Sequence, residues 1–469
     1  MRDFRLLVGG DLIRTENQLV VVNPATGARL ATCPRADETV LNEAVAAAKT
    51  AFKAWAALSW SDRSSRLSAL ADRMEKKQDD FAELMTLEQG KPLFLARIEA
   101  CQAIAILRTF AAMRLEDETL CDTDRMRVLQ QRSPLGVVAA IVPWNFPLIL
   151  LMSKLAPALA AGNCVVVKPA PTTPLTTLLL GEICADLLPP GVVNVVVDDN
   201  DLGDRLTRHP DIAKIAFTGS TPTGRRVMES AAPGLKHLTL ELGGNDAALV
   251  LADAPVKETA AALFHAAMVN SGQVCVAIKR AYVHDSLHDE ICAELTALAE
   301  AAIVDDGLVP GVQFGPLQNK AQFDRVLDLI EDCKRAGKVI AGGSAIDRPG
   351  YFVRPTIVRD LPDDARIVRE EQFGPVLPVL RYCDVDDAVS RINDSDFGLG
   401  ASVWGRDIDK ALAIASRLEA GTVWINKHLD LQFDIPFRGS KQSGIGAEFG
   451  LEGLREYTQA RVVNIAKAA

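Results

Sequence analysis

Apolar positions in the first quarter of the chain follow two different periods. Between residues 6 and 33, short apolar runs alternate with turn residues such as Gly9-Gly10 and Asn23-Pro24, which predicts short strands joined by turns. From Thr39 onward the spacing changes to three and four residues, as in an amphipathic helix. We therefore predict a first helix there, a second that begins near Ser61-Asp62 and a third after Gly90-Lys91-Pro92. The first two carry the apolar stripes Leu41, Val45, Ala48, Phe52, Trp55 and Leu67, Leu70, Met74, Phe81.

The middle of the chain alternates short β-rich runs with helix-like segments. This alternation predicts a parallel sheet with helices on both faces, from runs at 137–142, 165–167, 192–196 and 215–217. A second α/β unit is expected from 241 to about 430, with strands at 247–251, 280–283, 375–380 and 421–426. The most apolar stretch, 148–161, is interrupted by Lys154 and Pro157 and is too short to cross a bilayer. It predicts a buried helix.

Two further segments, 118–135 and 457–465, are polar and weakly β-like. Such segments are typical of an exposed strand pair, and an exposed strand edge invites pairing with another subunit.

Composition narrows the class of protein. A chain of 469 residues with 48% hydrophobic and 24% charged residues predicts a soluble enzyme of two or three domains. Its net charge of −10 argues against a nucleic-acid surface. The nine cysteines form no CxxC or CxxxC pattern and there are only six histidines, so we expect neither a disulfide framework nor a metal site. No secretory signal or membrane segment is evident, and we expect a cytoplasmic location.

Three residues in ordered local contexts suggest covalent chemistry on a carbonyl. Cys275 ends a polar, glycine-bearing turn at 270–275, Glu241 precedes a glycine pair, and Asn145 lies between two prolines. A thiolate can attack, a side-chain amide can hold the resulting oxyanion, and a carboxylate can take a proton from water. Taken singly, each has a simpler interpretation as a buried thiol, a solvated carboxylate or a turn residue. Only their joint occurrence favours catalysis.

The chain resembles the NAD(P)-dependent aldehyde dehydrogenase superfamily. The residues that carry the resemblance are PWNFP at 143–147, KPA at 168–170, FTGS at 217–220, ELGG at 241–244, GQVC at 272–275, EEQFGPV at 370–376 and KQSG at 441–444. The separation of 34 residues between Glu241 and Cys275 fits the family as well. The resemblance extends from about residue 40 to the final strand.

The resemblance implies a fold and a reaction. It implies a Rossmann-like dinucleotide-binding domain at 1–117 and 136–241, an α/β catalytic domain at 242–440, and a small β oligomerisation arm at 118–135 and 441–469. The implied reaction oxidises a small aldehyde to its carboxylic acid with NAD or NADP. It runs through a thiohemiacetal and a thioester on Cys275, with Asn145 holding the oxyanion and Glu241 activating water. A homodimer or homotetramer is expected.

The resemblance also implies the cofactor contacts, which are Val142, Pro143, Trp144, Lys168, Gly203, Phe217, Gly219, Ser220, Thr223, Leu242, Glu371 and Phe373. Lys168 would contact the adenosine ribose, Glu371 the nicotinamide ribose, and Phe373 the nicotinamide. No G-x-G-x-x-G follows the first β-rich run, so Thr218-Gly219-Ser220 is the candidate for the pyrophosphate, with an ordinary helix cap as the alternative.

Two departures from the family pattern bear on the choice of dinucleotide and point in opposite directions. Pro171 stands where many NAD-preferring relatives carry a glutamate that repels a 2′-phosphate. Asp198 and Asp199 replace a glycine-containing loop near the adenine and add negative charge. We therefore expect NAD or NADP, with a slight preference for NAD.

The substrate pocket and the alternatives are less specified. Expected walls are Leu148, Met152, Trp144, Val274, Val276 and the loop 428–437, which favour an apolar or modestly sized aldehyde. Arg438 replaces a common glycine and could bind an anionic group, form a structural ion pair or face solvent. His284 and His288 are expected at the surface, and the directions of Lys279 and Arg280 stay open.

The alternative functions are a CoA-acylating aldehyde dehydrogenase and a catalytically silent binding or structural protein on the same fold. Glu241 favours water over CoA as the acceptor, and the intact Cys275, Glu241 and Asn145 set argues against a silent protein.

Overall fold

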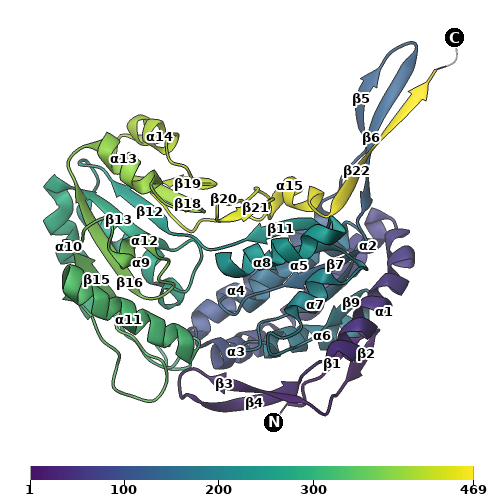
Figure 1. The fold of residues 1–469 in the computed structure, drawn as a ribbon, viewed down its shortest axis with the longest axis horizontal. Coiled ribbons are helices and arrows are strands. Elements are labelled where there is room, and N and C mark those ends of the chain that lie inside the picture. The colour runs from purple at the N-terminus through teal and green to yellow at the C-terminus, as the bar shows by residue number, and fades with distance from the viewer. Residues whose placement is uncertain (1, 468–469) are drawn as a thin grey trace.

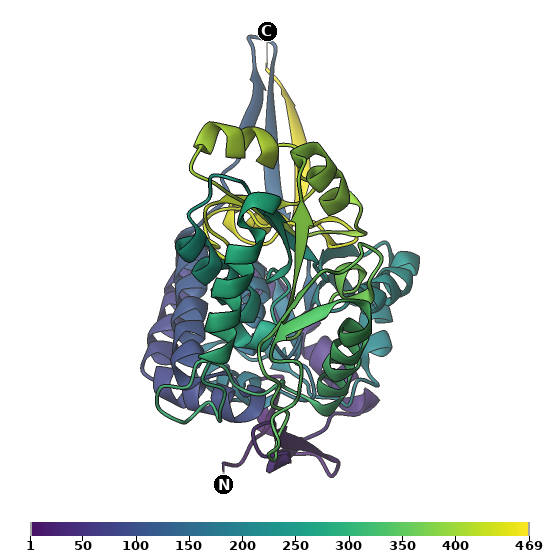
Figure 2. The same cartoon turned by 90° about the vertical axis from the view of Figure 1, so that its left-hand side faces the viewer.

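The computed structural model describes residues 2–467 as two α/β lobes and a projecting ribbon (Figure 1). The first lobe contains an eight-stranded sheet in the order β2-β1-β9-β8-β7-β10-β11-β21, and the second contains a seven-stranded sheet in the order β14-β15-β16-β13-β12-β18-β19. The ribbon is the three-stranded sheet β22-β6-β5. It stands away from both lobes in the two perpendicular views (Figures 1 and 2).

In the first lobe, β7 to β11 pair in parallel. The strands of this sheet are β1 (Leu6–Val8), β2 (Asp11–Ile13), β7 (Val137–Ile141), β8 (Cys164–Lys168), β9 (Val193–Val195), β10 (Ile212–Thr218), β11 (His237–Glu241) and β21 (Gly444–Ile445). Its helices are α1 (Glu38–Ala56), α2 (Trp60–Glu75), α3 (Gln78–Gln89), α4 (Leu93–Ala112), α5 (Pro147–Ala160), α6 (Leu175–Leu187), α7 (Gly203–Arg208), α8 (Thr221–Ala231) and the 3₁₀ turn η1 (Ala232–Gly234). A hairpin, β3 (Gln18–Asn23) and β4 (Ala28–Pro34), precedes α1.

In the second lobe, six neighbouring strands of the large sheet are parallel, and these are β15, β16, β13, β12, β18 and β19. Strand β14 is antiparallel at its edge. The strands are β12 (Asp246–Val250), β13 (Ile278–His284), β14 (Lys338–Ala341), β15 (Thr356–Arg359), β16 (Val376–Tyr382), β18 (Gly400–Trp404) and β19 (Thr422–Ile425), beside the small pair β17 (Phe397–Gly398) and β20 (Ser440–Lys441). The helices are α9 (Val256–Met268), η2 (Val269–Gly272), α10 (Asp285–Glu300), α11 (Lys320–Ala336), α12 (Arg366–Arg369), α13 (Val385–Asn393) and α14 (Ile408–Ala415).

Strand β12 shows why the sheet needs helices on both faces. Ala247 and Leu249 pack into one apolar cluster, with α11, α13 and α14, whereas Ala248 and Val250 pack into another, with α9 and α10. Alternate residues of a strand point to opposite faces, so an apolar residue at every position requires cover on both. The predicted α/β class is confirmed.

The ribbon is formed by β5 (Glu118–Asp122), β6 (Met126–Pro134) and β22 (Thr458–Ala466), with β22 and β6 in antiparallel register over their whole length. Before β22, α15 (Gly450–Arg455) packs on α5, and β21 pairs with β11 in the first sheet. The C-terminal part of the ribbon therefore begins at Thr458.

Two local predictions were wrong. Helix α2 begins at Trp60 and is capped by Ser59, whose hydroxyl accepts from the Asp62 amide, and it ends at Glu75, so that Phe81 belongs to α3. His288 is buried on α10, where Arg381 reaches its ring, and is not a surface residue. For His288, a partner distant in the chain overrode what the local sequence suggested.

Candidate active site

Five parallel strands of the first lobe deliver their carboxyl ends to one edge of the sheet. Ile141 pairs with Lys168 and with Phe217, and Thr218 pairs with Glu241, so the ends of β7, β8, β10 and β11 lie side by side. Ligands of open parallel sheets bind outside this edge. The expected site residues Val142, Pro143, Trp144, Lys168, Gly219, Ser220 and Leu242 all follow or end these strands.

The turn that carries the candidate nucleophile is conformationally strained. Asn270, Ser271 and Gly272 have φ values of 51°, 55° and 73°, in the left-handed region. A Cβ on Gly272 would lie 2.2 Å from the Gly374 carbonyl oxygen, so only glycine fits there. The Ser271 hydroxyl donates to the Gly315 carbonyl (2.7 Å), and Gln273 Nε2 donates to the Asn270 carbonyl (2.8 Å). These buried bonds fix the turn just before Cys275.

Asn145 is joined to this turn from the opposite side. Its Nδ2 donates to the Gln273 carbonyl (3.1 Å), and its own carbonyl accepts from Asn270 Nδ2 (3.1 Å). One hydrogen of the Asn145 amide is thereby used, and the other has no acceptor among residues 2–467, so that it can serve an anion that forms on a substrate at Cys275.

A buried ion pair supports the Asn145 loop from behind. The Lys91 ammonium is paired with Glu99, donates to the Asn145 carbonyl (2.8 Å) and lies 3.7 Å from the centroid of the Phe146 ring. Glu99 in turn accepts from the amide of Leu148 (2.9 Å) at the start of α5. Both side chains are fully buried. Sequence reasoning missed this pair, because Gly90-Lys91-Pro92 reads only as a helix break.

Glu241 ends β11 as a buried carboxylate. Neither of its oxygens has a geometrically regular hydrogen-bond partner among residues 2–467. Burial raises the pKa of the Glu241 carboxyl well above its ordinary value and the Glu448 charge acts in the same direction, whereas the Lys154 ammonium and the Cys275 thiol oppose the rise. Burial, and then the charge of Glu241, likewise raise the pKa of the Cys275 thiol. The negative charge of Glu241 therefore disfavours the Cys275 thiolate.

A second buried lysine lies close to Glu241. Lys154 Nζ on α5 is 2.7 Å from Glu448 Oε1 and 2.6 Å from the Thr218 hydroxyl. In the sequence, Lys154 is recognisable only as an interruption of an apolar helix. The structure gives it a cluster of partners at the carboxyl edge.

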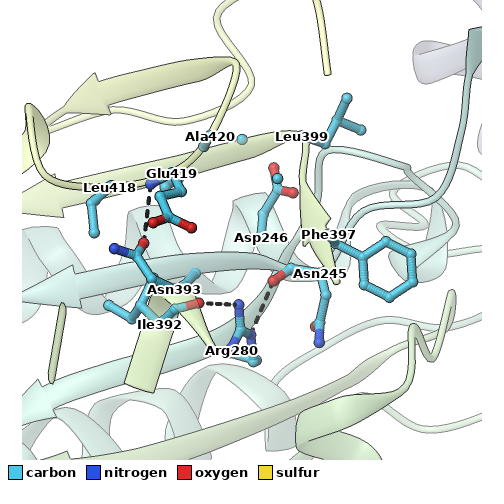
Figure 3. A pocket seen from close by; sticks show the side chains of 14 residues that line it. Asn245, Asp246, Arg280, Ile392, Asn393, Phe397, Leu399, Leu418, Glu419 and Ala420 are labelled. Carbon is cyan, nitrogen blue, oxygen red and sulfur yellow. Dashed lines mark hydrogen bonds between the residues drawn. The ribbon is translucent and has the colours of Figure 1, made fainter. Parts of the chain in front are cut away.

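Lys279 and Arg280 point to different places. Lys279 Nζ donates to the carbonyls of Val274 (2.9 Å) and Cys275, and it lies 3.5 Å from Glu371 Oε1. Arg280 instead donates to the carbonyls of Asn245 (3.0 Å) and Ile392 (3.3 Å), beside a cavity of about 10 Å³ (Figure 3). That cavity has room for about one water molecule and is too small for a substrate. Lys279 therefore stabilises the loop that carries Cys275, whereas Arg280 joins backbone segments within the second lobe.

The nicotinamide-side candidates also lie near this loop. Glu371 Oε1 accepts from the Gly244 amide (3.1 Å), and burial raises the pKa of the Glu371 carboxyl. Phe373, with a φ of 47°, packs edge-to-face on Trp144 at 5.4 Å between ring centroids. The contact between Phe373 and Trp144 thus links the segment after β7 in the first lobe to the segment before β16.

The start of α8 has the features of a phosphate cradle. Ser220 is the N-cap residue but makes no capping hydrogen bond, and its hydroxyl instead lies 3.0 Å from that of Thr223. A Cβ on Gly219 would lie 2.5 Å from the Phe217 ring, and one on Gly203 at the start of α7 would meet nothing within 4 Å. Uncapped amides at a helix start, with open space beside them, suit an anionic pyrophosphate.

The thiol belongs to an apolar part of the molecule. Cys275 is a partly buried member of the large apolar cluster of the first lobe, which also includes Leu148, Met152, Val274, Val276 and the loop residues Leu429, Leu431 and Phe433. His428 Nε2 lies 2.8 Å from the Val276 carbonyl, so this loop is tied to the nucleophile segment. Arg438 forms an ion pair with Glu452 at the surface, which is the structural option among the three considered for it.

Within residues 2–467, no group of histidine, cysteine and acidic side chains is arranged to hold a metal ion, and all nine cysteines are free. In the same part of the chain, none of the helices combines the length and the apolar character needed to cross a membrane.

Comparison with known proteins gives consistent matches over the whole chain. The model of the aldehyde dehydrogenase family matches residues 13–463. The chain is 42% identical to phenylacetaldehyde dehydrogenase from Pseudomonas fluorescens, over 98% of this chain and 96% of that protein. Its fold is similar to the NAD+ complex of aldehyde dehydrogenase from Bacillus cereus, with a TM-score of 0.97, 36% identity and coverage of 99% and 97%. An NADP-dependent enzyme of E. coli is equally similar, with a TM-score of 0.96, 36% identity and coverage of 99% and 98%.

Proposed function

The chain belongs to the aldehyde dehydrogenase family, and on this premise we propose that Cys275, Asn145 and Glu241 together oxidise an apolar aldehyde to its carboxylic acid. The reaction class is that of the family, an NAD(P)-dependent oxidation of an aldehyde. The observation that carries the residue roles is the meeting of a buried carboxylate, a half-buried thiol and a side-chain amide. The Glu241 charge raises the pKa of the Cys275 thiol, and Asn145 donates to the carbonyl of Gln273, two residues before Cys275.

The first step is attack by sulfur. Because burial raises the pKa of both the Cys275 thiol and the Glu241 carboxyl, the thiolate forms when its proton moves to ionised Glu241 or to water. The sulfur–carbon bond then forms and the carbonyl oxygen becomes an alkoxide. Asn145 Nδ2 and the Cys275 backbone amide stabilise that charge. A bound nicotinamide dinucleotide supplies the acceptor for the hydride that the alkoxide expels, which leaves a thioester on Cys275.

The second step is hydrolysis. Glu241 takes a proton from water, the oxygen–carbon bond forms, and the carbon–sulfur bond breaks to release the acid and the Cys275 thiolate. A buried carboxylate whose pKa is raised by burial, and which has no regular hydrogen-bond partner among residues 2–467, is a stronger base than an ordinary carboxylate and is suited to accept this proton. Water is the acceptor favoured by Glu241, and a CoA-acylating reaction would have no use for this base.

We assign the first lobe, 2–117 and 136–241, to dinucleotide binding and 242–440 to the catalytic domain. Of the expected arm at 118–135 and 441–469, we assign the strands of the ribbon, β5, β6 and β22, to oligomerisation, because β21 pairs with the first sheet. The uncapped start of α8 and the open space at Gly203 support a dinucleotide on the first lobe. Exposed apolar side chains on the ribbon support its pairing with a second copy in a homodimer or homotetramer, and these are Leu120, Met126, Val462 and Ile465. Nine free thiols fit a reducing, cytoplasmic compartment.

The substrate is proposed to be an aldehyde with an aromatic or aliphatic group. Support comes from the apolar cluster to which Cys275 belongs and to which Phe433 and Leu429 contribute. The similarity to an enzyme named for phenylacetaldehyde points the same way. Arg438 forms an ion pair with Glu452, and an acidic aldehyde is therefore not favoured by a positive charge at this position.

The decisive experiment is a panel of aromatic, aliphatic, amino- and semialdehydes with NAD or NADP, followed by absorbance of the reduced nicotinamide. Phenylacetaldehyde should give a higher kcat/KM than a charged semialdehyde. Cys275→Ala should lower turnover by roughly 10⁴-fold or more while dinucleotide binding is retained. Cys383→Ala, which removes an exposed thiol at the end of β16, is the matched control and should leave turnover unchanged.

Glu241→Gln tests the second step. It should give a burst of one reduced dinucleotide per site and then stall, because the thioester forms but is not hydrolysed. Steady turnover near the wild-type rate would contradict the assignment of Glu241, and acyl-CoA formation on addition of CoA would favour the acylating alternative.

A further inference from the structure

Two neighbouring strands place a buried ion pair at the dinucleotide edge of the first lobe. Lys168 is the last residue of β8, and Asp198 follows β9, which pairs with β8 in parallel. Lys168 Nζ lies 2.6 Å from Asp198 Oδ1, and the two side chains are 7% and 1% exposed. Asp198 Oδ2 accepts from the Leu202 amide (2.9 Å), just before α7. The carboxylate is therefore held in a fixed position at this edge.

Asp198 retains capacity to accept a further hydrogen bond. Its Oδ1 lies close to the Lys168 ammonium, but no donor among residues 2–467 reaches it with hydrogen-bond geometry. A buried carboxylate oxygen without a directed donor is costly unless a ligand supplies one. A carboxylate at the end of a strand in a parallel sheet is the group that binds the ribose hydroxyls of NAD.

The surrounding charges disfavour a 2′-phosphate at the same place. Lys168 is neutralised by Asp198, and Arg35, the other nearby cation, is paired with Asp201 (2.6 Å). Asp199 adds a further negative charge at the surface. A phosphate would bring a charge of about −1.5 to −2 to a site whose cations are already paired. Pro171, which follows Lys168 after two residues, has no carboxylate to offer.

We propose that Asp198 makes this enzyme select NAD over NADP, in place of the carboxylate that is missing at position 171. It accepts a hydrogen bond from an adenosine ribose hydroxyl, keeps Lys168 paired, and repels a 2′-phosphate. This inference depends on the proposed function, because it requires a dinucleotide at the carboxyl edge of the first lobe.

Asp198→Asn is the sharpest variant, since it removes the charge, preserves the shape and still accepts from the Leu202 amide. Dissociation constants for NADH and NADPH are measured by nucleotide fluorescence, without aldehyde. The wild type should prefer NADH, and the variant should shift the NADH-to-NADPH ratio toward NADPH by about tenfold or more, which corresponds to about 1.4 kcal/mol. The gain should come chiefly from tighter NADPH binding, since Lys168 becomes free to pair with the phosphate.

Asp199→Asn is the matched control, because it removes the same charge from the exposed neighbour and should change the ratio by less than about twofold. As a probe of the 2′-phosphate alone, 2′,5′-ADP should compete with NADH better in Asp198→Asn than in the wild type, whereas 5′-AMP should not. If Asp198→Asn folds poorly, Pro171→Glu in the wild-type background gives a second measurement, and it should add less than about threefold to NADH preference because Asp198 already fills the role.

An unchanged ratio in Asp198→Asn, an equal shift in Asp199→Asn, or a large gain in NADH preference from Pro171→Glu would each overturn the inference while leaving the proposed function intact. Failure of the wild type to bind either dinucleotide would instead overturn the proposed function.

Discussion

The two parallel sheets differ in how the helices at their carboxyl edges begin. In the second lobe, α10, α13 and α14 are each capped by the side chain of their own N-cap residue, His284, Asp384 and Asp407, whereas α9 and α12 are not. In the first lobe, α7 and α8 begin without any side-chain cap. An uncapped helix start leaves amide donors that water or a ligand must satisfy. Side-chain capping is therefore more frequent at the edge of the second sheet, and the starts of α7 and α8 keep amide donors for an anion.

Carboxylates at the two edges differ in the same sense. On the second lobe, Arg359 beside Asp289 lowers the pKa of that exposed carboxyl to about 2. On the first lobe, burial raises the pKa of Glu88 to about 7 and that of Glu241 well above its ordinary value. The second edge contains charges that are paired in solvent, whereas the first contains charges that the fold has withdrawn from solvent. Burying a carboxylate lowers the stability of the fold. At Glu241 the raised pKa also makes the carboxylate a better proton acceptor, which a catalytic site can use.

The largest expected effect of a single change falls on the pair behind Asn145. Lys91→Met leaves Glu99 as a buried, uncompensated carboxylate, which typically costs about 3–5 kcal/mol in the free energy of unfolding. It also removes the donor to the Asn145 carbonyl. Urea denaturation followed by tryptophan fluorescence should show a clear loss. Arg97→Met on α4, the helix that carries Glu99, breaks an exposed pair with Asp79 and should cost about 0–1 kcal/mol.

Asn145→Ala should affect the reaction rather than the fold. Loss of one oxyanion donor typically costs about 2.7–4 kcal/mol, so kcat should fall by about 10²–10³ with little change in the dinucleotide dissociation constant. Asn393→Ala in the second lobe removes an amide that also bonds backbone groups, at Arg417 and Glu419, and should lower stability without lowering kcat. Equal kcat values for wild type and Asn145→Ala would remove Asn145 from the oxyanion site.

The sequence predicted the elements and the motif residues better than it predicted the buried charges. Periodicity located most strands and helices to within a few residues, because a sheet covered on both faces leaves a strong apolar signal. The sequence did not predict the partners of Lys91 and Lys154, because these partners lie far away in the chain. Lys91 donates to the Asn145 carbonyl, and Lys154 donates to Glu448. A charged residue in an apolar helix does not reveal its partner. Phe81 was misplaced for the opposite reason, because its stripe continues unbroken across the end of α2.

Glu88 gives a pH-dependent difference between the lobes. Its carboxylate on α3 accepts from the amides of Leu175 (2.7 Å) and Thr176 (2.9 Å) at the start of α6, and burial raises its pKa from 4.5 to about 7. Between these pH values the folded chain holds a proton that the unfolded chain has lost. The stability from this group is therefore fully present below pH 4.5 and is lost as pH rises through 7, by about 3 kcal/mol.

Glu88→Gln cannot titrate and should flatten this part of the pH profile of the unfolding midpoint. Glu83→Gln, on the exposed face of the same helix, should leave the profile as in the wild type. If the profile of Glu88→Gln still falls between pH 4.5 and 7 as steeply as that of the wild type, another buried group is responsible.

The smallest effects test the contrast in capping directly. Asp384 accepts from the amides of Asp386 (2.8 Å) and Asp387 (2.9 Å), so Asp384→Ala should cost about 1 kcal/mol of stability and leave NADH binding unchanged. Ser220 makes no such bond, so Ser220→Ala should cost less than about 0.5 kcal/mol of stability and weaken NADH binding, since Ser220 stands at the helix start assigned to the pyrophosphate. Thermal unfolding and NADH titration of the two variants should give opposite rankings. The same ranking in both measurements would mean that the uncapped start of α8 is an ordinary helix end, and that the anion is bound elsewhere along the edge.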